Sequence, residues 1–347
     1  MKGEIVTTSR RSATVIGGVD FWTLNNDRAG RSRFYKKVFI DEAAFTGPEM
    51  IDMWEKSIKP TLLDLGGSCV VMSNTNGVDA DNFMWQICND PKHGFTQFHA
   101  PTWNNPMMPR YEIERLRLTT HPLVFAQEYG AEFIDWSGVA FFSRDDLLVN
   151  GAPVEYPVRC DLVFAVIDTA VKTGQEHDAT AVSYWAFTRH GGHPLVCLDW
   201  DLVQIEGSLL ETWLPNVFRR LEELCRVIRV RSGSAGAFIE DAQSGTILLQ
   251  QAMRRGLDAK PIESKLTALG KDARAINVSG YVYQGSVKFS RHAYDRTVNF
   301  KGQDRNHMLS QVLGFRVGDK NAATRADDLA DTFTYAIALA LGDSGGF

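Results

Sequence analysis

Residues 161–201 read DLVFAVIDTAVKTGQEHDATAVSYWAFTRHGGHPLVCLDWD, and three apolar runs in this stretch decide the fold of the second half of the chain. The runs cover about 161–168, 179–188 and 194–201, and each has the length and apolar content of a strand. This part of the sequence therefore predicts three strands in direct succession.

Regular elements are also expected after these strands. A long helix is predicted at about 207–227, where apolar residues such as Leu214 and Leu221 are spaced for one buried face. A strand that ends in Glu240 and Asp241 follows, and then come a helix near 245–256, a hairpin-like stretch at 281–290 and a last helix at about 325–341. Three consecutive strands, then helix, strand and helix, with a terminal helix, is the element order of an RNase H-like core.

Acidic residues stand at the ends of apolar elements in three separate parts of this half. They are Asp168 and Asp178 around the first two strands, Glu240 and Asp241 after a later strand, and Asp327, Asp328 and Asp331 at the start of the last helix. Taken singly, an acid at a strand end is often a turn former, and one at a helix start is often a cap. Together they supply the oxygen ligands that hold two divalent ions roughly 3.5–4 Å apart for phosphodiester hydrolysis. The pattern predicts a two-metal site for Mg²⁺ or Mn²⁺.

The first half of the chain has a different pattern. An apolar strand at 37–42 ends in Asp41 and Glu42, a helical stretch covers about 48–64, and a second strand at 68–72 runs into the polar turn 73–77. Strand, helix and strand with polar ends predict a parallel sheet. Residues 143–158, rich in glycine and proline, are expected to form a boundary. We therefore predict an α/β protein with domains at 1–142 and 159–347 and a linker at 143–158.

The composition agrees with two ordinary globular domains. The chain has 347 residues, of which 44% are hydrophobic and 23% are charged. The N-terminal segment has no apolar core of a secretory signal, and the apolar run at 335–341 is too short to span a membrane. The five cysteines include no C-x-x-C pair, which argues against a zinc site or a disulfide framework and for a reducing compartment.

Charge gives a mixed indication about nucleic acid. The net charge of −5 argues against a nucleic-acid-binding protein when taken alone. Residues 28–37 (RAGRSRFYKK), however, contain Arg28 and Arg31 among five basic residues and no acid. A phosphate-facing patch and a solvated loop face are equally compatible with this segment.

The ordered set of motifs resembles the large subunit of tailed-phage terminases, the motor-nucleases that package DNA into capsids. The resemblance covers nearly the whole chain. In the first half it rests on Val38–Phe45, which is similar to a Walker B strand, on Ser73–Gly77, which is similar to the coupling motif, and on Pro101–Pro106, Gln127-Glu128 and Glu132–Asp135. In the second half it rests on Asp168 with Asp178, Glu240–Gly245, Lys271 with Arg274, Gly285–Phe289 and Asp327–Asp331.

The resemblance implies roles for individual residues. Asp41 would hold the Mg²⁺ of a nucleotide through water, and Glu42 would polarise the attacking water. The nucleotide site would also include Ser73, Thr75 and Asn76, which would sense the γ-phosphate. In the nuclease, Asp168, Glu240 and Asp328 would bind the metal, with Glu240 preferred over Asp241, and Asp327 and Asp331 would assist. Contacts to double-stranded DNA would come from Arg28, Arg31, Lys271 and Arg274. The implied partners are a portal protein and a terminase small subunit, in the host cytoplasm and not at a membrane.

Two departures from the family stand out. The 347 residues contain no G-x-x-x-x-G-K-[ST] sequence, although the family carries this phosphate-binding P-loop well upstream of its Walker B strand. We therefore expect an incomplete ATPase domain that uses ATP only with a partner carrying the P-loop. Ala326 stands where many relatives have a histidine. The alternatives are a stand-alone RNase H-like nuclease or resolvase, a non-catalytic packaging component that docks such a partner, and a degraded prophage remnant.

Overall fold

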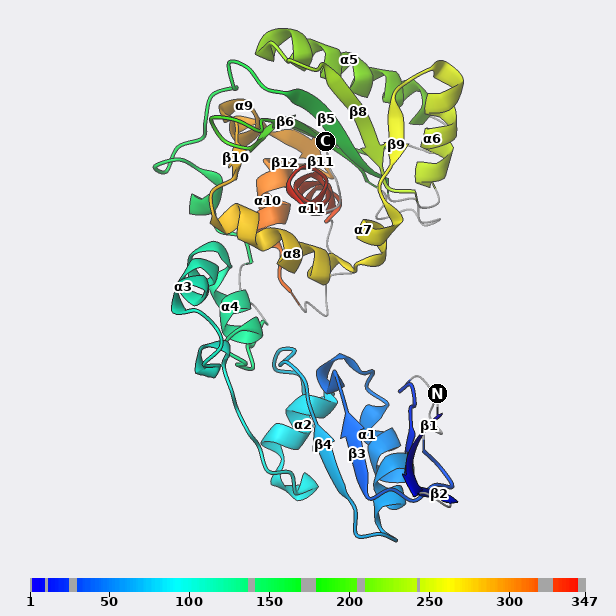
Figure 1. Ribbon diagram of the computed structural model, residues 1–347. Helices are drawn as coiled ribbons and strands as arrows, with labels where there is room; N and C mark the ends of the chain where they lie inside the picture. The colour runs from blue at the N-terminus through cyan, green and yellow to red at the C-terminus, as the bar shows by residue number, and fades with distance from the viewer. Residues whose placement is uncertain are drawn as a thin grey trace. The chain divides into compact units, whose positions relative to one another are not determined.

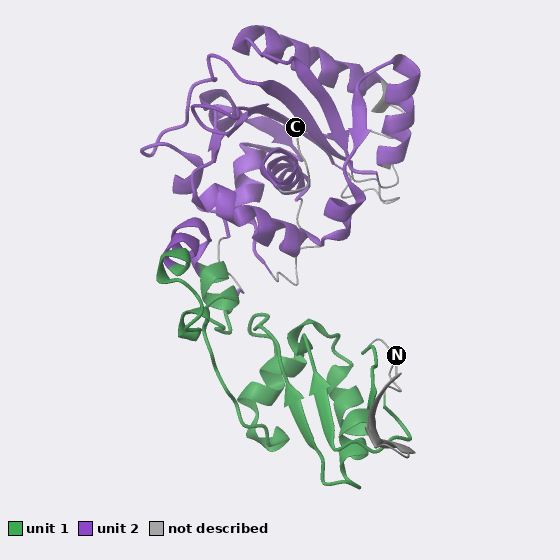
Figure 2. Cartoon of the chain, viewed as in Figure 1, with its two compact units in different colours: residues 1–113, 123–135 green, residues 114–122, 136–347 purple. Residues whose placement is uncertain are grey.

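The computed structural model describes residues 2–9, 12–24, 30–136, 141–169, 179–204, 210–241, 244–317 and 327–342. Arg28, Asp178 and Ala326, which the sequence singled out, lie outside the described residues. The chain forms two compact units, coloured separately in Figure 2: unit 1 is Met1–Ile113 with Leu123–Asp135, and unit 2 is Glu114–Pro122 with Trp136–Phe347.

Unit 1 contains the predicted parallel strands. β3 (Lys37–Ile40) pairs in parallel with β4 (Ser68–Val71), so that Ile40 lies opposite Val71. The predicted helix between them is a series of short helical turns: α1 (Met50–Met53), the π-helical η2 (Trp54–Ile58) and the 3₁₀-helical η3 (Lys59–Leu62). Unit 1 also contains the antiparallel β1 (Lys2–Ser9) and β2 (Ser12–Asp20), the helix α2 (Phe83–Asn89) and, from Leu123 onward, α4 (Pro122–Glu128). The helix α3 (Arg110–Thr119) belongs to unit 1 up to Ile113 and to unit 2 from Glu114.

The β3–β4 pair is covered on one face. Ile40 is buried with Met50, Trp54 and Phe83 in a core built from α1, η2 and α2. On alternate positions the side chains point the other way, and there Phe39 is 62% exposed. Among the described residues no third strand pairs with β3 or β4, so the described part of this sheet has one bare apolar face and two free edges.

Unit 2 is built on one six-stranded mixed sheet of order β10-β7-β6-β5-β8-β9 (Figure 1). The three strands that the sequence predicted in succession, β5, β6 and β7, are antiparallel to one another, whereas β8, β9 and β10 pair in parallel with their neighbours. The strands are β5 (Leu162–Thr169), β6 (Thr180–Phe187), β7 (Leu195–Val203), β8 (Ser234–Ile239), β9 (Ala259–Pro261) and β10 (Val287–Phe289).

Helices cover both faces of this sheet (Figure 1). Alternate residues of β5, including Val163 and Ile167, pack against α5 (Leu210–Ile228) and α6 (Ser244–Arg255). The opposite face holds α11 (Asp328–Leu341), whose Phe333 contacts Trp185 of β6, and α11 in turn contacts α8 (Lys271–Tyr283) and α10 (His307–Gly314). The shorter elements are α7 (Ser264–Ala268), α9 (Arg291–Asp295) and the hairpin of β11 (Val298–Phe300) and β12 (Gln303–Arg305).

The prediction of a hairpin at 281–290 is wrong. Residues 281–283 end α8, and Val287–Phe289 form β10, which pairs in parallel with β7 at the sheet edge. The hairpin of this region lies later, at β11 and β12. A short apolar run after a turn fits a hairpin strand and an added edge strand equally well, because periodicity does not specify the partner. In the described part of the chain, no helix has the length and apolar character needed to cross a membrane.

Candidate active site

Carboxylates from the three predicted parts of unit 2 converge at one end of the sheet. Asp168 is near the end of β5, and Glu240 directly follows β8. Because β5 and β8 are parallel neighbours, with Ile167 opposite Ile239, the two acids stand side by side at the same sheet edge. Asp328 opens α11, which packs across β5, and is 7% exposed.

The electrostatics of Asp168 reflect this convergence. Burial raises the pKa of the Asp168 carboxyl well above its usual range, and repulsion from Asp331, Asp328 and Glu240 raises it further. No described residue forms an ion pair with Asp168, and Lys271 opposes the shift only through its longer-range field. Among the described residues, negative charge therefore exceeds positive charge around Asp168.

The pKa values of two acids of α11 are also raised. Burial and the nearby charge of Asp327 raise the pKa of Asp328 to about 7. Burial also raises the pKa of Asp331, although Lys271 and Arg274 oppose the shift. Such clustering of like charges in a poorly solvated place is unfavourable for folding and is typical of sites that bind cations.

Two basic residues of α8 meet the acids of α11. The Lys271 ammonium lies 2.6 Å from Asp327 Oδ2 and 2.7 Å from Asp331 Oδ2, and Arg274 forms an ion pair with Asp331 Oδ1. Burial lowers the pKa of Lys271, but the carboxylates of Asp331 and Asp327 raise it by more, so the side chain stays charged. The side chain of Arg274 is only 4% exposed, which places it inside the site instead of on a surface open to DNA.

The donor chemistry of the cluster fits a hard divalent ion, because carboxylate oxygens are the ligands that Mg²⁺ and Mn²⁺ prefer. Within the described residues, however, no three His, Cys, Asp or Glu side chains are close enough together to hold a metal ion as they stand. The residues thus fit a metal by type and by charge, and coordination requires them to draw closer together.

Glu240 and Asp241 occupy different surroundings. The Asp241 side chain is exposed and accepts a hydrogen bond from the hydroxyl of Thr246 at 2.7 Å, in the first turn of α6. Glu240, by contrast, is among the charges that raise the pKa of Asp168. Glu240 also accepts a hydrogen bond from the hydroxyl of Tyr335 at 3.1 Å. The geometry favours Glu240 over its neighbour as the residue that faces the cluster.

In unit 1, Asp41 and Glu42 follow β3 and are both exposed. The backbone amide of Glu42 donates to Asp41 Oδ1 at 3.1 Å, and Glu42 has a left-handed conformation with φ 53°. A non-glycine residue holds such a conformation only where its surroundings enforce it. Here Ala43 N donates to Met72 O at 3.3 Å and Ala44 N to Ser73 Oγ at 2.9 Å, which ties the acidic turn to the end of β4.

The polar turn after β4 is tied to other parts of unit 1. Asn76 Nδ2 donates to Ala44 O at 3.2 Å, beside the acidic turn. Thr75 is buried, and its hydroxyl donates to Glu132 O at 2.8 Å and lies 3.3 Å from Gln127 O. The predicted γ-phosphate sensors thus connect the acidic turn to the segment 127–132. Arg31 is exposed and donates to Ser57 Oγ at 2.9 Å, and its predicted partner Arg28 is outside the described residues.

A basic pocket of about 460 Å³ adjoins the carboxylates, and no sequence pattern indicated it. Its lining includes Lys271 and Asp327 together with Arg305 of β12 and Arg316. Within the described residues neither arginine forms an ion pair with an acid; Arg316 donates to the carbonyl oxygens of Leu313 and Phe315. Lys271 is more than 30 residues from the two arginines in the sequence, and the fold brings all three cations to one pocket.

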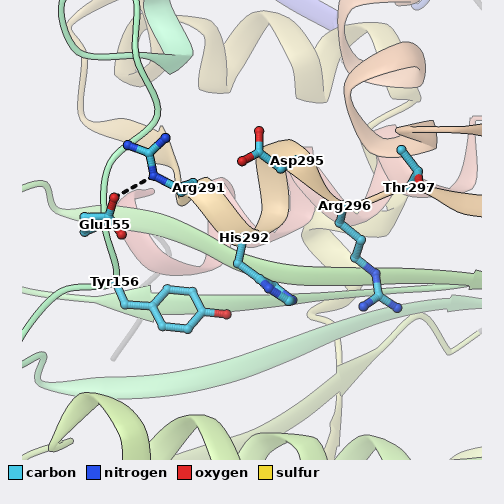
Figure 3. Close-up of a pocket in the computed structure, with 7 residues that line it drawn as sticks. All are labelled: Glu155, Tyr156, Arg291, His292, Asp295, Arg296 and Thr297. Carbon is cyan, nitrogen blue, oxygen red and sulfur yellow. Dashed lines mark hydrogen bonds and ion pairs between the residues drawn. The ribbon is translucent and has the colours of Figure 1, made fainter.

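A second charged cluster lies on the α5 face of the sheet, away from Asp168. Buried Asp199 of β7 accepts from Arg220 Nε at 2.8 Å and pairs with His292 at 3.3 Å and Arg296 at 3.4 Å. Figure 3 shows His292 and Arg296 extending from the α9 region toward the strands, in a pocket of about 570 Å³. Since each charge near Asp199 has an opposite partner, this network is structural.

Comparisons with known proteins are consistent with these observations. No protein-family model matches the chain. Part of the sequence is 29% identical to the large terminase subunits of Thermus phage G20c and Thermus virus P23-45, covering 32% of this chain and 25% of each relative. The matched segment thus spans about a quarter of the length of these curated relatives.

The fold is that of a solved terminase. The large terminase of a thermophilic bacteriophage, solved in complex with ADP, aligns over 97% of this chain and 79% of its own, with a TM-score of 0.56 and 12% identity. The complex of the same terminase with ATP-γ-S gives a TM-score of 0.57. At this identity the likeness concerns the fold alone. The resemblance of this chain to the large subunits of phage terminases is therefore confirmed, in sequence over part of the chain and in its α/β fold over nearly all of it.

Proposed function

We propose that this chain is a metal-dependent DNA endonuclease of the terminase large-subunit type, in which Asp168, Glu240 and Asp328 bind Mg²⁺ or Mn²⁺. The observation that carries the proposal is the convergence of these acids from three separate parts of unit 2 into one cluster, in which burial and mutual repulsion raise the pKa values of Asp168 and Asp328. Asp331 and Asp327 would assist the metal site indirectly, by holding Lys271 beside it through ion pairs. Among the described acids, no other cluster combines burial with such an excess of negative charge.

The roles of the residues follow from their positions. A bound divalent ion pair would supply an activated water and stabilise the leaving oxygen of the phosphodiester. Asp168 is central, because it is repelled by all three of its acidic neighbours. Arg305 and Arg316 in the adjoining basic pocket would hold the DNA backbone, and such phosphate contacts read no base sequence. The expected product is therefore a cut with little sequence preference.

Cleavage of DNA tests the proposal directly. The full chain, incubated with supercoiled plasmid and Mn²⁺, is expected to produce nicked and linear DNA, with Mg²⁺ supporting a slower reaction because it demands stricter geometry. The reaction is followed on agarose gels, with excess EDTA as the control. Cleavage that continues undiminished in EDTA would exclude metal-dependent chemistry. Loss of cleavage in EDTA and its return on addition of Mn²⁺ would support it.

We further propose that the ATPase part of this chain works only with a polypeptide that carries a P-loop. Asp41 and Glu42 could place a metal ion and a water, but the 347 residues contain no P-loop sequence to hold the β- and γ-phosphates in line. The other proposed partners are double-stranded DNA, a portal protein and a terminase small subunit, in the host cytoplasm.

The chain alone is expected to hydrolyse ATP no faster than buffer, because positioning of the phosphates supplies most of the catalysis in such sites. Phosphate release is the measurement. A complementing P-loop polypeptide should restore turnover, and Glu42→Ala should then remove it. Hydrolysis by the chain alone that survives replacement of both Asp41 and Glu42 would contradict this proposal and leave the nuclease proposal untouched.

A further inference from the structure

One face of α11 carries more than the acids of the site. Asp328, Asp331 and Tyr335 are spaced three and four residues apart and therefore lie on the same side of the helix. On the neighbouring α8, Lys271 and Arg274 are also three apart and meet this face. The two helices thus bring acidic, basic and phenolic side chains into one contact surface.

Arg274 is fixed by three different contacts with α11. Its guanidinium pairs with Asp331 Oδ1, its Nε donates to Thr334 Oγ1 at 2.9 Å, and its central carbon lies 3.7 Å from the centre of the Tyr335 ring. The side chain is almost fully buried. A planar guanidinium stacked on an aromatic ring and held at its edge leaves that ring little freedom. Arg274 therefore sets the position of Tyr335.

Tyr335 in turn reaches across to the sheet. The residue is 1% exposed, and its hydroxyl donates to Glu240 Oε1 at 3.1 Å. Among the described residues, the bond from Tyr335 is the one hydrogen bond to the Glu240 side chain. It uses Oε1, so Oε2 has no hydrogen-bond partner among these residues. The hydroxyl thus fixes one carboxylate oxygen and leaves the other free. Asp331, Arg274, Tyr335 and Glu240 form a continuous chain of contacts from one side of the acid cluster to the other.

We propose that Tyr335 is a positioning residue of the metal site, which orients Glu240 as a ligand through its hydroxyl and is itself held by Arg274. The inference rests on the proposed function. A glutamate has several rotatable bonds, and without a partner it loses conformational freedom whenever it binds an ion. Hydrogen bonds that orient metal ligands commonly change metal affinity by roughly 10- to 100-fold.

The test is the Mn²⁺ affinity of the full chain, measured by titration calorimetry. Tyr335→Phe keeps the ring on Arg274 and removes only the hydroxyl, so it is expected to weaken Mn²⁺ binding by roughly 10- to 100-fold. The metal-free unfolding midpoint should stay close to that of the parent. Tyr156→Phe is the matched control, because its hydroxyl donates to Leu198 O at 3.2 Å in the same unit and does not touch the acids. It should leave the affinity unchanged.

A Glu240→Gln background separates positioning from general stability. If Tyr335 acts through Glu240, adding Tyr335→Phe to Glu240→Gln weakens Mn²⁺ binding no further. Additive losses, or a Tyr335→Phe variant that binds Mn²⁺ as tightly as the parent, would overturn the inference. Should Tyr335→Phe destabilise the metal-free chain more than Tyr156→Phe does, the additivity measurement still decides. A parent chain that binds no Mn²⁺ at all would instead overturn the proposed function.

Discussion

Replacing Asp168 by asparagine is expected to reduce Mn²⁺-dependent DNA cleavage by on the order of 10²- to 10³-fold, while raising the unfolding temperature of the metal-free protein. The first effect follows from removing the carboxylate at the centre of the acid cluster. The second follows because the same substitution removes repulsion with Asp331, Asp328 and Glu240. If Asp168 had only a structural role, its replacement would lower both the cleavage rate and the unfolding temperature.

Single-turnover cleavage of plasmid DNA and thermal unfolding in EDTA measure the two effects. Asp258→Asn is the control, because Asp258 is an exposed acid of unit 2 that pairs with Lys260 at 3.4 Å. It should change neither quantity. If the Asp168→Asn variant cut DNA at the parental rate, Asp168 would be only a strand-end residue and the proposed site would be wrong.

The pH dependence of stability provides a related check. The pKa of Asp328 is about 7 in the folded protein and 3.8 is its ordinary value, so the folded state binds the proton more tightly than the unfolded state. Its contribution to the free energy of unfolding is therefore largest at low pH and is lost as the pH rises through the interval between these values. Denaturant unfolding in EDTA should show this fall in the parent and less of it in Asp328→Asn. Saturating Mn²⁺ should reduce the fall.

Replacing Asp199 by alanine is expected to lower the free energy of unfolding by about 3 kcal/mol, without a direct effect on the metal site. The Asp199 side chain is 4% exposed and faces Arg220, Arg296 and His292, so its loss leaves several positive charges without their shared partner. The value is set at the low end for a buried ion pair, because both arginines are about 30% exposed and water can reach them.

Urea unfolding of the full chain, monitored in unit 2, measures this change. Asp201→Ala is the matched control, since Asp201 makes one contact with Arg296 at 3.3 Å and is 33% exposed. Its effect should be within about 1 kcal/mol. If Asp199→Ala and Asp201→Ala lowered the free energy of unfolding equally, the buried ion pairs of Asp199 would stabilise the fold no more than the partly exposed pair of Asp201 does.

The sequence predicted the parts of the fold that have a strong local signal. β5, β6 and β7 are long apolar runs, and α11 is an apolar helix that begins with acids, so their order was enough to suggest the architecture. β10 was mistaken for part of a hairpin, because a three-residue strand carries no information about its partner. The acids Asp168, Glu240 and Asp328 could be proposed as site residues because each ends or begins such an element.

Other residues of the candidate site have no local signal in the sequence. Tyr335 stands inside an apolar helical run and would be taken for core, and only its hydrogen bond to Glu240 distinguishes it. Arg274 was predicted as a DNA contact, since the sequence does not indicate that α8 buries it against α11. Arg305 and Arg316 come together in a pocket through the packing of the β11–β12 hairpin, which charge counting along the chain does not capture.

The β3–β4 pair has a practical consequence for work with this protein. Parallel strands are ordinarily covered on both faces, and here Phe39, Val70 and Met72 are exposed beside two strand edges that no described residue pairs with. Such a surface is a template for strand addition by a second molecule, so self-association of concentrated samples should begin in unit 1 and not at the acid cluster. Charged substitutions at Phe39 and Val70 are therefore the first choice for keeping the full chain dispersed during nuclease assays, because they lie outside every residue set proposed to bind metal, nucleotide or DNA.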